Sequence, residues 1–147
     1  MNNTYDKLLE FKKQYPATIA WRLKAHSKVI EKHLNPGEEV TYVFAAQKGV
    51  SSLDIFSTFV VVLTNKRILL AQKRLVFGYT FLAVTPDMFN DLTVNTGMIW
   101  AKIYIDTIKE TIMLSNVSKH AASDIETQIT EYMMEEKKKY VLPEQSK

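Results

Sequence analysis

The chain begins with apolar residues at helical spacing. They predict a first helix between Tyr5 and Tyr15, which Pro16 ends because the residue before a proline is pushed out of the helical region. A second helix is predicted over Ala17–His33, where one side carries Ile19, Leu23, His26, Ile30, His33 and Leu34. The "NPG" triplet that follows ends this helix. We therefore expect an N-terminal two-helix arm over residues 1–34.

From Glu38 onward the apolar residues follow the spacing of β-strands. Seven short segments rich in β-branched and aromatic residues are separated by turn-forming residues. The predicted strands are Val40–Ala46, Phe56–Leu63, Arg67–Lys73, Phe77–Val84, Met88–Val94, Ile99–Ile105 and Thr111–Leu114.

Helical spacing then returns, with a capping-box pattern at Ser123 and Glu126. One side of this last helix carries Ala122, Ile125, Ile129, Tyr132 and Met133. The fold class is therefore mainly β (α+β), with a domain over residues 35–139. Residues 140–147 are expected to form a flexible tail.

The stretch "FVVVLTNKRILLAQ", from Phe59 to Gln72, predicts a tight hairpin with Asn65 and Lys66 in its turn. Asparagine tolerates the positive φ that such a turn requires. Counting outward from the turn pairs Leu63 with Ile68, Val61 with Leu70, Val62 with Leu69 and Val60 with Ala71. Both faces of the hairpin are then apolar, so the arm or a second copy of the chain is expected to cover the face of Val60, Val62 and Leu69.

Two basic residues stand between the apolar runs of this hairpin. Arg67 shares a face with Thr64, where its side chain can lie over the strand and donate to loop carbonyls, so a structural role is favoured over ligand binding. Lys66 at the tip is expected to be a solvated charge that discourages edge pairing.

Basic residues are concentrated in the N-terminal segment. The 147 residues carry a net charge of +3 at pH 7, and residues 1–34 hold seven basic against three acidic residues. Trp21, Lys24, Lys28 and Lys32 lie opposite the apolar stripe of the second predicted helix. Three interpretations stay open for them: a solvated lysine face with Trp21 packed on the neighbouring helix, a protein interface, or direct contact with lipid or nucleic acid.

The residue types present exclude several kinds of chemistry. The absence of cysteine excludes disulfides, thiolate metal sites and cysteine nucleophiles, and the four glycines are scattered. His26 and His33 are two helical turns apart, about 10 Å, which is poor spacing for a metal pair, although a buried His26 would respond to pH.

No nucleophile, acid or base is paired with a partner in the sequence, so we expect neither an enzyme nor a cofactor. The strand aromatics lack the basic residues that a nucleic-acid partner requires. No long apolar segment is present, which predicts a cytoplasmic protein.

Three segments carry a family resemblance: "LNPGEEVTYVF", "VVLTNKRILLA" and "MFNDLTVNTGMIWAKIYIDTIKETIMLSNVSKHAASDIETQITEYM". Over about residues 34–136 they resemble the bacterial PH-like (pleckstrin homology-like) domains, most nearly the YokE-like branch. The resemblance implies a seven-stranded antiparallel barrel or sandwich capped by the C-terminal helix. It also implies a non-enzymatic scaffold, since such domains are generally regarded as lacking activity and some assemble into oligomers.

Eukaryotic relatives that bind phosphoinositides place several Lys and Arg around the loop between strands one and two. The corresponding stretch here, "AQKGVSSLDIFS", has Lys48 alone with Asp54 nearby. A phosphoinositide site of that kind is therefore not expected.

These patterns predict a non-catalytic interaction module that binds a protein partner or its own copy through apolar strand and arm surfaces. The alternative is peripheral binding of an anionic membrane or anionic ligand through Trp21, Lys24, Lys28 and Lys32. The two functions differ in salt dependence, because screening weakens the second.

Overall fold

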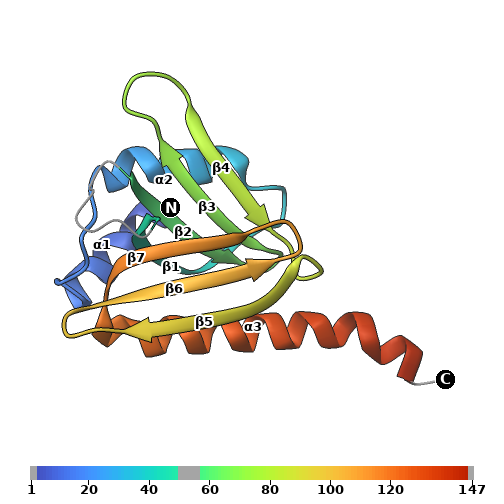
Figure 1. Cartoon of the computed structure of the whole chain (residues 1–147). Coiled ribbons are helices and arrows are strands. Elements are labelled where there is room, and N and C mark those ends of the chain that lie inside the picture. The colour runs from blue at the N-terminus through green and yellow to red at the C-terminus, as the bar shows by residue number, and fades with distance from the viewer. Residues whose placement is uncertain (1–2, 50–56, 146–147) are drawn as a thin grey trace.

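The elements follow one another in the predicted order (Figure 1). The structure is a computed structural model that describes residues 3–49 and 57–145. The arm contains α1 (Thr4–Gln14) and α2 (Leu23–His33). The strands are β1 (Val40–Lys48), β2 (Thr58–Thr64), β3 (Ile68–Lys73), β4 (Tyr79–Val84), β5 (Phe89–Thr96), β6 (Trp100–Thr107) and β7 (Thr111–Ser118). The last helix is α3 (Lys119–Gln145).

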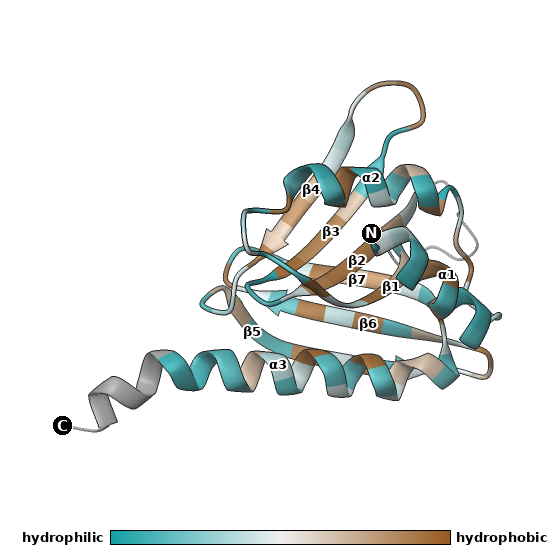
Figure 2. Ribbon diagram, turned by 180° about the vertical axis from the view of Figure 1, so that it is seen from behind, coloured by the Kyte–Doolittle hydropathy of each residue, from teal (hydrophilic) through white to brown (hydrophobic). Residues whose placement is uncertain are grey.

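The strands form one antiparallel sheet in the order β4-β3-β2-β1-β7-β6-β5. The sheet curls into a half-barrel, and its two halves meet where β1 pairs with β7 at Gln47–Ser115 and Lys48–Leu114 (Figure 1). Helices α1 and α2 pack against the β1–β4 half, while α3 packs against the β5–β7 half (Figure 2). The predicted fold class is confirmed.

The β2–β3 hairpin has the predicted register. The observed pairs are Leu63–Ile68, Val62–Leu69, Val61–Leu70 and Val60–Ala71. All eight side chains are at most 4% exposed, so both faces of the hairpin are buried. A strand pair in this state needs a cover on each side.

Helix α2 covers one face of this hairpin. Phe81 lies opposite Ala71 in the β3–β4 pairing, and its ring stacks on His33 of α2 with 4.1 Å between ring centroids. Val62 and Leu69 lie on the same face as Ala71, because side chains opposite or two apart along a strand share a face. The sequence allowed two covers for this face, the arm or a second copy of the chain. In the structure the chain's own arm covers it.

The other half of the sheet has one buried face. Along β6 the buried residues alternate with more exposed ones, and the buried set is Ala101, Ile103, Ile105 and Thr107. Helix α3 adds its own buried stripe to this half: Ala121, Ala122, Ile125, Ile129 and Met133. The alternation is the pattern of a strand with a core on one side.

Helix α2 begins at Leu23, later than the predicted start at Ala17. Arg22 adopts a left-handed conformation, with φ 55° and ψ 41°, which a right-handed helix cannot include. The preceding segment is bonded to the sheet instead. The indole N–H of Trp100 donates to the carbonyl of Ala17 at 2.8 Å, and the backbone N–H of Ile19 donates to β7 at 3.4 Å. These long-range bonds outweigh the local helical spacing.

Several other element boundaries differ from the predictions by a few residues. Strand β4 begins at Tyr79, so Phe77 lies in the preceding loop. Helix α3 continues to Gln145, beyond the predicted domain boundary at residue 139. Residues 50–56, which include Asp54 and Phe56 of the predictions above, lie outside the described residues. Among the described helices, none is both long enough and apolar enough to cross a bilayer.

Candidate functional site: a cationic groove

A groove of about 580 Å³ lies between α2 and the β3–β4 hairpin. Its lining residues are Arg22, Lys24, Ala25, Lys28, Val29, Lys32, Lys73 and Tyr79. Five of these are cationic and none is acidic. Within the part of the chain that the structure describes, no carboxylate lies within salt-bridge distance of those five cations. We call this feature the cationic groove.

Helical geometry places three lysines along one wall of the cationic groove. Lys24, Lys28 and Lys32 are four residues apart, so they lie on one face of α2, and all three are exposed. Val29 is buried beneath them. Like charges at this spacing destabilise a helix by about 0.2–0.5 kcal/mol per pair. An anion bound between them would relieve that repulsion.

The opposite wall consists of Lys73 and Tyr79, which are paired residues of β3 and β4. The backbone N–H of Lys73 donates to Nδ1 of His26 at 2.8 Å, and the Arg22 guanidinium donates to the Lys73 carbonyl at 3.3 Å. Nζ of Lys32 lies 5.8 Å from the centre of the Tyr79 ring, a cation–π distance. These contacts tie the two walls together.

His26 is the buried member of this connection. It is 2% exposed, and its Nδ1 accepts the Lys73 hydrogen bond, which requires an unprotonated Nδ1. Burial, together with the nearby positive charge of Arg22, lowers the pKa of His26 to about 4. His26 therefore positions the far wall and adds no charge at neutral pH. Of the described residues, no three His, Cys, Asp or Glu side chains gather to hold a metal ion.

The sheet, its C-terminal helix and the groove can be compared with known proteins. The family model of the bacterial PH domain matches residues 34–131, more than half of the chain. The chain belongs to the bacterial PH domain family. No curated protein matches the chain. Domains of this family are generally non-catalytic binding modules, while assignment to the YokE-like branch stays a prediction.

The match defines which parts of this PH domain are family features and which are additions. The seven described strands and the first half of α3 lie within the matched residues. The arm precedes them, and it contributes one whole wall of the cationic groove. The groove is thus a joint feature of the family sheet and of an element outside the family match.

The predicted interaction residues lie in three different places in this PH domain. Lys24, Lys28 and Lys32 line the cationic groove as a set. Trp21 precedes α2 instead of sharing its lysine face, and it lines a smaller hollow at the base of the β3–β4 loop. Its ring lies 5.6 Å from the guanidinium carbon of Arg22.

The predicted strand residues lie in the core. Val60, Val62 and Leu69 are each 0% exposed under α2. The strand surface considered for self-association is therefore an internal surface between the sheet and the arm, because α2 has already buried it.

Arg67 forms its main contacts with a buried carboxylate. Its guanidinium donates to both carboxylate oxygens of Glu38, at 2.9 and 3.0 Å, and to the carbonyl of His33 at 3.0 Å. The Glu38 side chain is 0% exposed and also accepts from the Thr64 hydroxyl at 2.6 Å. Arg67 thereby joins the end of α2 to the β2–β3 turn.

Glu38 stays ionised although it is buried. Burial raises the pKa of a carboxyl group, but the hydrogen bonds from Arg67, from the backbone N–H of Asn35 and from Thr64 outweigh burial. The pKa of Glu38 is consequently held below its ordinary value. The pair is a charged, hydrogen-bonded unit at the point where the arm meets the sheet, and neither residue lines the cationic groove.

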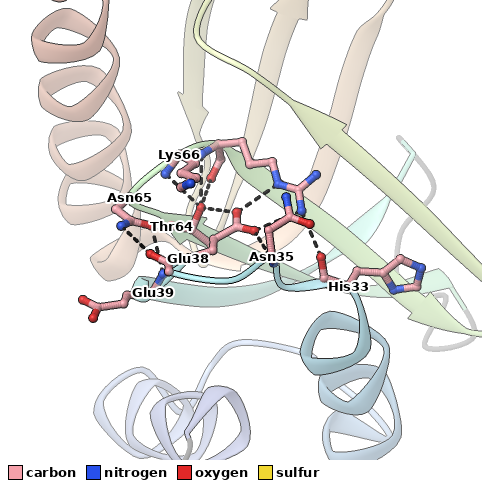
Figure 3. A network of polar contacts seen from close by, with 9 residues as sticks. His33, Asn35, Glu38, Glu39, Thr64, Asn65 and Lys66 are labelled. Atoms are coloured by element: carbon pink, nitrogen blue, oxygen red, sulfur yellow. Dashed lines mark hydrogen bonds and ion pairs between the residues drawn. The ribbon is translucent and has the colours of Figure 1, made fainter.

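The β2–β3 turn is held by Thr64. The hydroxyl of Thr64 accepts from the backbone N–H groups of Lys66 and Arg67, both at 3.1 Å. The described non-glycine residues with positive φ do not include Asn65, so the predicted left-handed conformation there is wrong. The side chain of Asn65 instead accepts from the backbone N–H of Glu39 at 2.9 Å (Figure 3). Lys66 is exposed, as predicted.

Sequence reasoning missed the far wall of the cationic groove. Lys73 and Tyr79 are remote from α2 in the chain, and no motif links them to it. The available signal was the "KRLVFGY" stretch, in which two cations precede three apolar residues at a hairpin loop. That pattern differs from the polar and glycine-rich composition of an ordinary turn.

Proposed function

We propose that this bacterial PH domain is a binding module that holds phosphate-bearing anions in the cationic groove. The observation that carries the proposal is the gathering of five cations from α2, its N-cap residue and β3, with no carboxylate in the lining or within salt-bridge distance among the described residues. Uncompensated charges of one sign attract counter-ions, and a walled site does so more strongly than a flat surface.

The composition of the groove supports a phosphate ligand in particular. Lysine binds phosphate as a point charge, and the guanidinium of Arg22 can donate to several oxygens at once. Ala25 and Val29 supply an apolar floor, and Tyr79 a hydroxyl and a ring. The volume of about 580 Å³ lies in the range of small-molecule sites, roughly 300–1,000 Å³.

Binding of protein or self-association through the apolar strand face is less well supported. That face is covered by α2, so a partner would first have to displace the arm and its buried contacts. The cationic groove needs no such displacement.

The test compares two charge-reversal variants with equal net charge. Lys28→Glu with Lys32→Glu alters the cationic groove, while Lys102→Glu with Lys109→Glu alters exposed lysines on and after β6. Inorganic tripolyphosphate is titrated by calorimetry, and vesicles of equal parts phosphatidylglycerol and phosphatidylcholine are used in flotation, each at two salt concentrations.

We expect the groove variant to lose binding by about tenfold or more, since two cation–phosphate contacts near a surface are worth about 1 kcal/mol each. The β6 variant should keep most of it, and added salt should weaken binding of the unaltered chain. Equal losses in both variants, or no binding of either probe, would overturn the proposal.

A further inference from the structure

The β3–β4 hairpin extends beyond α2 and ends in a protruding loop (Figures 1 and 2). Strand pairing ends at Lys73 and Tyr79, and the backbone N–H of Arg74 donates to the carbonyl of Gly78 at 3.0 Å. Gly78 has a φ of +66°, a left-handed conformation that glycine adopts at little cost. The loop therefore has a defined, closed shape.

Three consecutive apolar side chains form the end of this loop. Leu75 is 61% exposed, Val76 75% and Phe77 82%. Figure 2 shows this part of the loop as hydrophobic, standing clear of the sheet and helices. Water disfavours such a cluster, and its concentration in one protruding segment marks it as a contact surface. We call these three residues the apolar tip.

Among the described residues, the charged side chains that adjoin the apolar tip in the chain are positive. Lys73 and Arg74 directly precede it, and the cationic groove opens at the base of the same hairpin. The smaller hollow at the same base is lined by Arg22, Lys73 and Arg74, with no acidic residue among its described lining. An apolar tip above a collar of cations matches the depth profile of an anionic bilayer, whose phosphates lie outside its acyl chains.

We propose that the apolar tip inserts into the interfacial region of an anionic membrane while the cationic groove holds lipid phosphates. The inference rests on the proposed function and names the source of the phosphate as a membrane surface. Both parts act together, because insertion of the tip brings the collar of cations to the level of the headgroups. Apolar burial and electrostatic attraction then add to the same partition free energy.

The shape of the apolar tip favours a bilayer over a protein partner. A specific protein interface contributes roughly 800 Å² from each partner. The tip offers three side chains on a convex loop, and the surfaces beside it are cationic. A bilayer requires no complementary pocket, so a small convex wedge is sufficient.

Insertion can be measured with a dye at one position. The chain has no cysteine, so Val76→Cys labelled with an environment-sensitive fluorophore reports on the apolar tip alone. With vesicles of equal parts phosphatidylglycerol and phosphatidylcholine we expect a blue shift and quenching by spin-labelled acyl chains. The matched control is Met98→Cys in the β5–β6 turn, where Met98 is 89% exposed, and its dye should not respond. Equal responses at both positions, or none at residue 76 on bound protein, overturn the inference.

Partition measurements separate this inference from the proposed function. Val76→Ser with Phe77→Ser should weaken vesicle partition by about tenfold or more, because two large apolar contacts are lost, and should leave tripolyphosphate affinity unchanged. Met98→Ser with Ile108→Ser removes two other exposed apolar side chains and should change neither vesicle partition nor tripolyphosphate affinity.

Each contrary outcome has a distinct meaning. If the two tip substitutions leave vesicle binding unchanged, or if the chain binds tripolyphosphate but not vesicles, the inference is overturned and the proposed function stands. Association of the chain with itself through the tip, detected by light scattering and abolished by the tip variant without any vesicle binding, also overturns the inference. Failure of the unaltered chain to bind either probe overturns both.

Discussion

The two halves of the sheet differ in whether one face or both faces are buried. In the β2–β3 hairpin every residue from Val60 to Leu63 and from Ile68 to Ala71 is buried, whereas β6 alternates between buried and more exposed residues. The first half is covered inside by the core and outside by α2, and the second has a cover on one face. The difference is readable in the sequence, because a continuous apolar strand needs two covers and an alternating strand needs one.

The N-terminal arm contributes to the buried core of the sheet. The arm precedes the residues that match the family, yet Leu8, Phe11, Val29 and Ile30 belong to the same buried core as the strands. It is therefore part of the folded unit. By packing on the hairpin it also creates the cationic groove, so the cover and the candidate site arise from one docking event.

The largest effect is expected from charges placed under the arm. Val62→Lys with Leu69→Lys puts two ammonium groups between β2–β3 and α2, at a cost of more than about 5 kcal/mol, enough to unfold a typical domain. Thr93→Lys with Asn95→Lys on the exposed face of β5 should change stability by less than about 0.5 kcal/mol. Urea unfolding measures both. A folded, monomeric Val62/Leu69 variant would mean that α2 does not cover this face.

The next effect concerns the ion pair between Glu38, which precedes β1, and Arg67 at the hairpin turn. Glu38→Gln removes the carboxylate that accepts from Arg67 and Thr64, and leaves the guanidinium without its charge partner. We expect a loss of about 3 kcal/mol, the lower end for breaking a buried pair, because Arg67 is 17% exposed. Thermal unfolding checks it, with Glu39→Gln, an exposed neighbour, as the matched control. Equal stability of the two variants would contradict the role assigned to Glu38.

The stability of the arm contact should depend on pH through His26. The folded pKa of about 4 lies below the ordinary value of 6.5, so the unfolded chain binds the proton more tightly. The contribution is complete above pH 6.5 and is lost as the pH falls toward about 4, with a total of at most roughly 3 kcal/mol. Glu38, whose pKa is also lowered, adds a loss in the same direction below about pH 4.5. Urea unfolding as a function of pH measures the sum.

The variant His26→Gln isolates the histidine in that measurement. Glutamine can accept the Lys73 hydrogen bond but does not titrate, so the slope between pH 6.5 and 4.5 should flatten. An unchanged slope would assign the pH dependence to other groups.

The smallest effect tests the link from the arm to the more exposed half of the sheet. Trp100→Phe keeps an aromatic ring and removes the indole N–H that donates to Ala17. The expected loss is about 0.5–1.5 kcal/mol, the net value of one hydrogen bond. Amide hydrogen exchange should show a local increase around residues 17–22 before α2 is affected. Exchange that rises equally throughout the sheet would argue against a local tether.

Much of the fold was predictable because its signals are local. The β2–β3 register follows from counting outward from one turn, and the continuous apolar run predicts that both faces of the hairpin are covered. The predictions are wrong where hydrogen bonds that the residue spacing does not reveal decide the backbone conformation. Helical spacing predicts Trp21 within a helix, but hydrogen bonds from Trp100 and to β7 hold the preceding segment outside it. The residue type predicts a left-handed Asn65, but the Thr64 hydroxyl closes the turn.

By itself, the sequence determined the order and type of the elements, the pairing of the central hairpin and the clustering of positive charge in the arm, because spacing and composition act over neighbouring residues. The tertiary structure decided which residues the lysines of α2 would face. It placed Lys73 and Tyr79 beside them, and it paired Glu38 with Arg67. Such contacts depend on how a helix docks on a sheet, and docking is the joint result of many buried side chains that no single stretch encodes.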